Sequence, residues 1–122
     1  MRLLMVGVGQ EMGAALRFLL SQEPDICIVG ESSSSQELLP CLEVLRPDAV
    51  LLDHDLRGLP LAELLAKLRA HHPKPSVLVL CSVSERERAA LAGGSCVCLD
   101  RASHPRQLLT ALRVLQLESD HE

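Results

Sequence analysis

Short apolar runs alternate along this chain with stretches whose apolar residues recur every three or four positions. An uninterrupted apolar run is typical of a strand buried on both faces, whereas the longer spacing is typical of a helix with one buried face. The runs predict strands at residues 3–8, 26–29, 49–53, 76–80 and 96–99. The spacing predicts helices that begin near residues 12, 34, 60, 84 and 103, and the fourth of these ends near residue 92.

Several residues mark the expected helix starts. The segment from Ser34 to Glu37 has the spacing of a capping box, in which both side chains satisfy free backbone N–H groups. Pro40 lies inside the same helical pattern and has no N–H group, so we expect a kink there or a later start. Pro60 is expected to be the first residue of the next helix, and Ser103 to cap the last one.

A strand followed by a helix occurs five times, without an internal repeat or a linker. Parallel strands joined by helices require right-handed crossovers, which predicts an α/β fold with helices on both faces of one sheet. The pattern leaves the strand order open. We expect one domain over residues 1–117, followed by a polar tail or the start of a linker at residues 118–122.

Composition excludes several classes of protein. The net charge is −4 and the 12 Lys and Arg residues form no cluster, which argues against direct binding of nucleic acid. No apolar run is long enough to span a bilayer, and the first residues do not resemble a secretory leader, so we expect a cytoplasmic protein without membrane contact. The five cysteines show no metal-binding spacing and are interpreted as core residues.

Asp53 directly follows the apolar run at residues 49–52, at the expected carboxyl end of a strand. Ligands and chemistry gather at that edge of an open parallel sheet. One reading makes Asp53, Asp55 and Asp100 a divalent metal site. Another makes Cys81 and Cys98, on neighbouring strands, a thiol switch.

A further reading concerns the glycines that follow the first strand. Gly7, Gly9 and Gly13, with Glu31 at the end of the second strand, have the layout of a dinucleotide-binding fingerprint. Glycines there let a pyrophosphate approach the helix start, and the acid would meet a ribose. The match is loose because Met12 stands where the fingerprint requires Gly or Ala. The simpler interpretation is that the glycines only form a loop.

Five segments of the chain form a recognisable pattern when they are taken together. They are Glu23-Pro24-Asp25-Ile26, Val29-Gly30-Glu31, Arg46-Pro47-Asp48 through Leu52-Asp53, Gly58-Leu59 and Val77-Leu78-Val79-Leu80. In their order and spacing they resemble the receiver domain of two-component response regulators, in the branch that carries LuxR-type helix-turn-helix output domains. The resemblance covers about residues 2–115 and implies the flavodoxin-like strand order 2-1-3-4-5, with Asp53 as the phosphoryl acceptor.

The other positions of that family's site depart from its pattern. Receivers have an acidic pair for Mg²⁺ where this chain has Gly7 and Val8, and a Thr or Ser where it has Cys81. Their lysine is replaced by Asp100, and their aromatic switch residue by Val97. Arg101 follows, so a shift of one residue in register could restore a cation. Without the metal ligands and the cation, little remains to assist phosphoryl transfer.

We therefore expect an atypical, phosphorylation-independent receiver that is not an enzyme and needs no cofactor. A conventional receiver, phosphorylated on Asp53 with Mg²⁺, is the alternative. The expected partners are a second copy of the chain, an attached output domain or a histidine kinase, and DNA only through an output domain. The last helix carries more apolar residues than one buried stripe needs, so some should face outward. These interface candidates are Leu108, Leu109, Leu112, Val114, Leu115 and Leu117.

Overall fold

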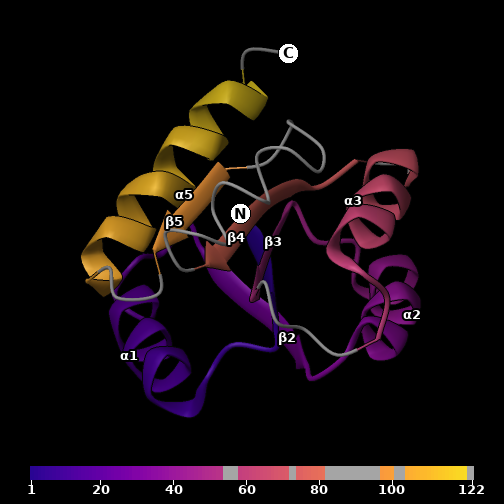
Figure 1. Ribbon diagram of the computed structural model, residues 1–122. Coiled ribbons are helices and arrows are strands. Elements are labelled where there is room, and N and C mark those ends of the chain that lie inside the picture. The colour runs from indigo at the N-terminus through magenta and orange to yellow at the C-terminus, as the bar shows by residue number, and fades with distance from the viewer. Residues whose placement is uncertain (54–57, 72–73, 82–96, 101–103, 121–122) are drawn as a thin grey trace.

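A parallel sheet of five strands forms the centre of the computed structural model, which describes residues 1–53, 58–71, 74–81, 97–100 and 104–120. The strand order is β2-β1-β3-β4-β5 (Figure 1), which confirms the fold class and the order that the resemblance implies. The strands are β1 (Arg2–Val6), β2 (Cys27–Ser32), β3 (Ala49–Asp53), β4 (Ser76–Cys81) and β5 (Val97–Asp100).

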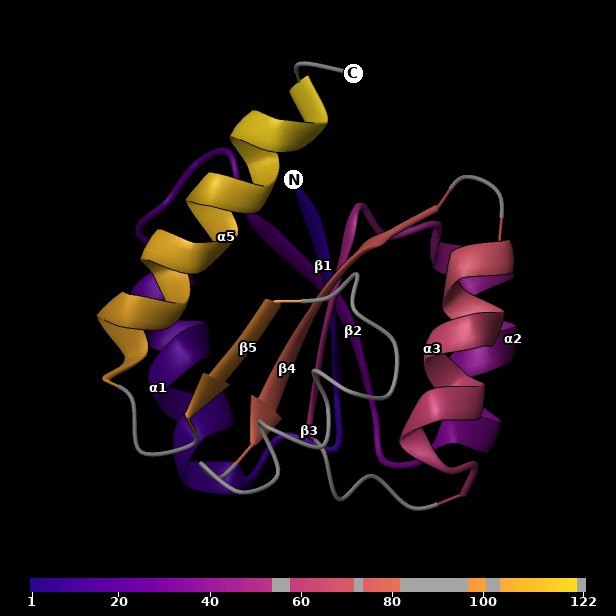
Figure 2. The ribbon, with the colours of Figure 1, turned by 45° about the horizontal axis from the view of Figure 1, so that its top comes forward.

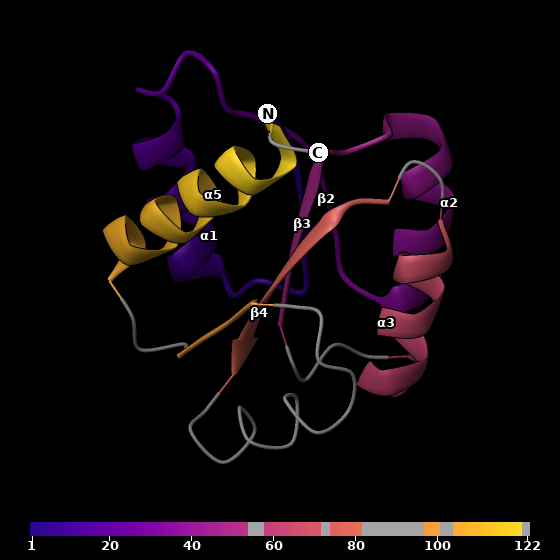
Figure 3. The ribbon, with the colours of Figure 1, turned by 90° about the horizontal axis from the view of Figure 1, so that it is seen from above.

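Helices cover both faces of this sheet. Helices α1 (Gln10–Leu20) and α5 (Pro105–Asp120) lie side by side on one face, and α2 (Ser35–Leu45) and α3 (Leu61–Ala70) lie on the other (Figures 1 and 3). The helix expected over residues 84–92 falls outside the described residues. Within the described part of the chain, no helix has both the length and the apolar character to cross a membrane.

Each face of the sheet has its own apolar core, and β3 contributes to both. Ala49 and Leu51 pack toward α1 and α5, whereas Val50 and Leu52 pack toward α2 and α3. All four side chains are buried. Because neighbouring strand residues point to opposite faces, a strand covered on both sides needs an unbroken apolar run. This explains the pattern that predicted the strand.

The start of α2 confirms the capping box and shifts one of its contacts. The Ser34 hydroxyl oxygen accepts a hydrogen bond from the Glu37 N–H at 3.4 Å. The Glu37 carboxylate accepts from the backbone N–H and the hydroxyl of Ser33, at 2.8 and 3.0 Å, rather than from the N–H of Ser34. These two bonds, the backbone one first, hold the pKa of Glu37 below its usual value.

The structure tests the predictions about two prolines. Of the two effects expected from Pro40, the later start is wrong, because α2 begins at Ser35 and continues through Pro40, whereas the kink stays a prediction. A proline here removes only the bond to the carbonyl of Gln36. Both residues are exposed, so water can satisfy that carbonyl. Pro60 precedes α3 as its extended N-cap residue, rather than opening the helix.

Some element ends also differ from the expectation. β1 ends at Val6, so Val8 lies beyond the strand, and β2 extends to Ser32. α1 begins two residues earlier than expected, at Gln10. α5 continues through Asp120, so residues 118–120 are helical, and the expected domain boundary at residue 117 stays a prediction. Ser103, the expected cap of this helix, lies outside the described residues.

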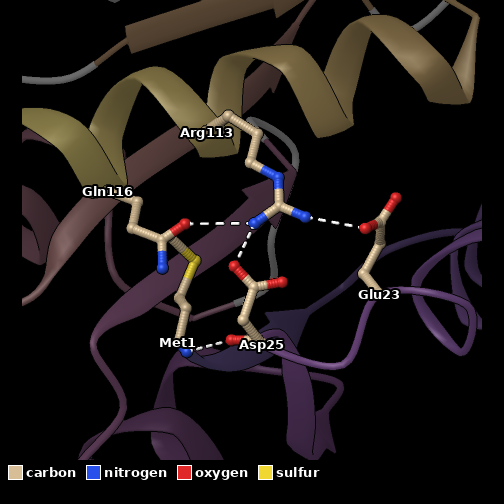
Figure 4. A network of polar contacts seen from close by, with 5 residues as sticks. All are labelled: Met1, Glu23, Asp25, Arg113 and Gln116. Carbon is tan, nitrogen blue, oxygen red and sulfur yellow. Dashed lines mark hydrogen bonds and ion pairs between the residues drawn. The ribbon is translucent and has the colours of Figure 1, made fainter.

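A network of polar groups fastens α5 to the corner between α1 and β2 (Figure 4). Arg113 donates to Glu23 at 2.7 Å and also to Asp25, and the N-terminal ammonium donates to the Asp25 carbonyl. The hydrogen bond from Arg113 is the main reason that the pKa of the Asp25 carboxyl is lowered. The network therefore fixes the middle of α5 at the end of the sheet opposite the carboxyl ends of the strands.

Candidate functional site

The carboxyl ends of β3, β4 and β5 meet at one edge of the sheet (Figure 2). Asp53, the last residue of β3, is half-buried and pairs in register with Leu80. Strand alternation gives it the face of Leu51, so Asp53 belongs to the side of the sheet that α1 and α5 cover. The next pair along the edge is Cys81 with Asp100.

A cleft of about 680 Å³ opens beside Asp53 on this side, and we call it the edge cleft. The sheet contributes Asp53 and Leu80 to its wall. The start of α5 contributes Pro105, and the loop and first turns of α1 contribute the rest of the described lining, which is Gly9, Gln10, Glu11, Met12 and Ala15. Two carboxylates and no Lys or Arg are therefore found among the described lining residues.

The two positions where receivers hold their metal ligands carry no oxygen ligand in their side chains. Gly7 has a φ of +67°, which favours glycine, and its N–H donates to the Ser32 carbonyl at 2.9 Å. Val8 is half-buried and packs against the core under α1 and α5. Mg²⁺ prefers an octahedral set of oxygen ligands. These residues do not fit the magnesium site that the fold family implies.

The other departures lie where the sequence placed them. Cys81 is fully buried at the end of β4. Asp100 is half-buried at the end of β5 and pairs with Cys81, so the acid itself occupies the strand end. Val97 is the first residue of β5, and its side chain falls outside the described ones. Arg101, the cation that a register shift could supply, is likewise outside the described residues.

The two residues Gly58 and Leu59, shortly before α3, contact the start of α2. Ser35 is fully buried, and its hydroxyl oxygen accepts from the Leu59 N–H at 2.9 Å. Gly58, one residue earlier, has a φ of +111° and lies so close that a Cβ atom there would be 1.9 Å from the Ser35 hydroxyl oxygen. Only glycine fits this contact. The contact holds the residues before α3 against the start of α2.

The described residues give no support to the alternative metal site or to the thiol switch. Among the described residues, no group of three or more His, Cys, Asp or Glu side chains is placed to hold a metal ion, and Asp55 is not among them. Cys98 pairs with Val79, two positions before Cys81 on the neighbouring strand. A thiol switch through these cysteines stays a prediction.

The prediction of a dinucleotide-binding site is also untested, but the structure shows another contact for one of its residues. Glu31, the acid proposed to meet a ribose, forms an ion pair with Arg17 of α1. The guanidinium group of Arg17 also lies close to Gly13. A Cβ atom added at Gly13 would be 3.4 Å from it. Gly9 faces open space at the start of α1.

The interface candidates on α5 differ in how far their side chains are buried. Leu108, Leu112 and Leu115 are buried in the core, so they are corrected to core residues. Leu109 packs partly against the same core, and the side chain of Leu117 is not described. Val114 is 48% exposed. Sequence analysis missed Phe18 of α1, which is 71% exposed although it is the one aromatic residue of the chain.

The position of Phe18 could have been found from helix geometry. Leu16 and Leu20 face the core, and a residue two positions from each lies on the opposite side of a helix with 3.6 residues per turn. Glu11 and Pro105 of the edge cleft gave no such signal, because the cleft joins residues that are far apart in the sequence.

Comparison with known proteins finds transcriptional regulators and protein-glutamate methylesterases among the relatives of this chain. No protein-family model matches the chain. The nitrate/nitrite response regulator protein NarL of Escherichia coli is 37% identical over 97 residues, which are 77% of this chain and 44% of NarL. The uncharacterized transcriptional regulatory protein YhcZ of Bacillus subtilis is 29% identical over 101 residues, 81% of this chain and 47% of YhcZ. The chain thus spans less than half the length of either relative.

Solved structures share the fold. The non-phosphorylated receiver domain of the stress response regulator RcsB from Escherichia coli superposes with a TM-score of 0.83 at 20% identity. The match covers 97% of this chain and 94% of that one. The strand order and the helices on both faces are therefore those of a receiver domain.

Proposed function

Because this chain is a response-regulator receiver domain, we propose that it acts in signal transduction without phosphorylation of Asp53, as a non-enzymatic module that contacts other proteins. The observation that carries the proposal is the composition of the sheet edge. The side chains of Gly7 and Val8 offer no ligand oxygen for a metal, and Asp100 stands where receivers have a lysine. The proposal keeps the cytoplasmic location predicted from the sequence.

Electrostatics support this reading. A phosphoryl group on Asp53 would add roughly −1.5 to −2 charges. The described lining of the edge cleft already contains Glu11 as a second carboxylate and includes no Lys or Arg. Phosphoryl transfer depends on positioning and on neutralising the charge that develops, so this edge would oppose the reaction.

The buried end of β4 supports it as well. Receivers place a hydroxyl there, whereas Cys81 is fully buried and its thiol is a weaker hydrogen-bond donor. A buried cysteine behaves as a small hydrophobic residue. This position therefore favours packing over the recognition of a phosphoryl oxygen.

The test is incubation of the chain with acetyl phosphate and Mg²⁺, followed by intact-mass measurement. We expect the mass and the oligomeric state to stay unchanged. As a positive control, the combined variant Gly7→Asp, Val8→Asp, Cys81→Thr and Asp100→Lys restores the receiver pattern and should become phosphorylated, provided that circular dichroism shows it folded. Stoichiometric phosphorylation of the unaltered chain, absent in Asp53→Asn, would contradict the proposal.

For the protein contact we propose self-association through the face that α1 and α5 present to solvent. Phe18 and Val114 lie on these neighbouring helices and are the large apolar side chains that this described face exposes. Exposed apolar residues on adjacent helices are a feature of interaction surfaces. Contact with an attached output domain or a histidine kinase is a further proposal, which follows from the resemblance to receivers. The relatives NarL and YhcZ are longer than this chain, which leaves room in them for a further domain.

Sedimentation velocity over a range of concentrations tests this contact. Phe18→Ser should weaken a dimer by at least about tenfold, since an aromatic side chain at the centre of an interface contributes upward of about 1.4 kcal/mol. Val44→Ser is the matched control, because Val44 is 80% exposed on α2, on the opposite face of the sheet. Equal effects of both substitutions, or a monomer at every concentration, would refute the proposed face.

A further inference from the structure

A second cleft lies beside β2, the edge strand of the sheet, and we call it the β2 pocket. Its volume is about 290 Å³. The end of α1 and the start of β2 line it, through Arg17, Leu20, Ser21, Ile26, Cys27 and Ile28. Leu20 and Ile26 are buried and belong to the core under α1 and α5, so part of the pocket wall is the core itself. Free energy is gained when another apolar group covers such a wall.

The size of the β2 pocket suits a single side chain better than a larger ligand. Small-molecule sites typically occupy roughly 300–1,000 Å³, and the β2 pocket lies at the lower end of that scale. An apolar cavity of about 150 Å³ is enough to hold a benzene ring. A phenyl ring therefore fits into the β2 pocket.

The one aromatic side chain of this protein lies next to that pocket. Phe18 of α1 is 71% exposed. Ser21 follows Phe18 by three positions and Arg17 by four, so it neighbours both residues on the helix surface. The Ser21 hydroxyl also donates to the Phe18 carbonyl at 2.6 Å. The phenyl ring thus stands beside the pocket of its own chain but remains in solvent.

A two-fold dimer covers both the ring and the pocket. In such an interface, residue i of one copy contacts residue j of the other, and j contacts i. The ring of each copy can then enter the pocket of the other copy. A different partner protein would have to supply an aromatic side chain and a pocket of its own, whereas a second copy of this chain supplies both. The complementarity therefore favours a second copy as the occupant.

We propose that Phe18 of each copy inserts into the β2 pocket of the other copy in a two-fold dimer. The inference rests on the proposed function, because it specifies how the proposed self-association takes place. The phenyl ring lies against Ile26 and Ile28. The methylene stem of Arg17 forms one wall of the pocket, while its guanidinium group pairs with Glu31.

The composition of the chain makes this contact directly observable by NMR. Ile26 and Ile28 are its two isoleucines, and Phe18 is its one phenylalanine. Deuterated chain with protonated, ¹³C-labelled Ile methyl groups is mixed with an equal amount of unlabelled chain, at a concentration where sedimentation velocity shows a dimer. We expect nuclear Overhauser effects from the phenyl protons of the unlabelled copy to the Ile methyl groups of the labelled copy. They should vanish when the unlabelled copy is Phe18→Ser.

Two further variants test the wall of the pocket. Arg17→Ala removes the methylene stem and should weaken the dimer at least about fivefold in sedimentation velocity. Glu31→Gln is the matched control, because it removes the same ion pair but leaves the stem in place. Since a surface ion pair contributes little, its effect should stay below about twofold. Equal weakening by the two variants, with circular dichroism showing both folded, would refute the role of the pocket.

Failure of this inference can be told apart from failure of the proposed function. If Phe18→Ser weakens the dimer but the Ile methyl groups show no contact with the phenyl ring, the pocket inference alone is refuted. If the chain is a monomer at every concentration, the inference fails together with the proposed self-association. Phosphorylation of Asp53 would overturn the phosphorylation-independent function and leave the contact of Phe18 with the β2 pocket unaffected.

Discussion

Replacing Gly58 by alanine should destabilise the domain through one defined contact. The φ of Gly58 is +111°, and an added Cβ atom would lie 1.9 Å from the Ser35 hydroxyl oxygen. No real Cβ contact is that short, so the hydroxyl has to turn away. The turn breaks the hydrogen bond between Ser35 and the Leu59 N–H, which measures 2.9 Å.

The magnitude follows from these two effects. A side chain held at such a φ costs about 1–3 kcal/mol. A buried hydrogen bond whose donor is left unsatisfied costs about another 1–3 kcal/mol. We expect Gly58→Ala to lower the free energy of unfolding by about 2–6 kcal/mol, out of a total that is typically about 5–15 kcal/mol. For a chain of this length, each kcal/mol lowers Tm by about 4 °C, so the expected fall is roughly 8–24 °C.

Urea denaturation followed by far-ultraviolet circular dichroism measures these changes, since the chain has no Trp or Tyr to report by fluorescence. Gly9→Ala is the control: an added Cβ atom there meets nothing within 4 Å, so we expect a loss below about 1 kcal/mol. Ser35→Ala alone should cost about 1–3 kcal/mol. In the double variant the hydrogen bond is lost only once, so the combined cost should fall short of the sum by about 1–2 kcal/mol. Additive costs would refute the proposed contact.

Two further predictions concern the helix layer of α1 and α5. Because Arg113 holds the pKa of Asp25 below the ordinary 3.8, this ion pair stabilises the fold above that pH and is lost as the pH falls through the lowered value. The difference in stability between the unaltered chain and Arg113→Gln should therefore shrink in urea titrations below about pH 4, and a difference that does not depend on pH would contradict the ion pair. Leu112→Ala should cost about 2–5 kcal/mol because Leu112 is fully buried, whereas Val114→Ser should cost less than about 1 kcal/mol in the same assay, and similar losses would contradict the orientation of α5.

Burial explains which parts of this fold could be predicted. The run from Val50 to Leu52 identified a central strand, because a strand between two helical layers has no wet face to interrupt the pattern. The spacing of Leu108 and Leu112 predicted α5, because both side chains face the core on one side of the helix. The strand order came only from the resemblance to receivers, since local patterns do not record which strands are neighbours.

The edge cleft was harder to predict because it is made by the fold and not by a local pattern. Glu11, Leu80 and Pro105 are far apart in the sequence, and nothing in any one segment marks them as neighbours. The contact between Ser35 and Gly58 has the same character. By contrast, the missing metal ligands at Gly7 and Val8 could be predicted, because the resemblance to receivers assigns a role to each of these two positions in the sequence.

Two of the positions that differ from the receiver pattern lie outside the apolar cores of the sheet. Gly7 follows β1 and Asp100 ends β5, and neither belongs to either core. Cys81 is the exception, since it is fully buried, and there the chain has a side chain of weaker polarity. Asp53 keeps its carboxylate at the same edge, beside apolar walls and a second acid. Phosphoryl transfer depends on groups that position the phosphoryl group and neutralise its charge, and the substitutions at this edge replace such groups. The edge is therefore altered for that reaction while the two apolar cores beneath it stay packed.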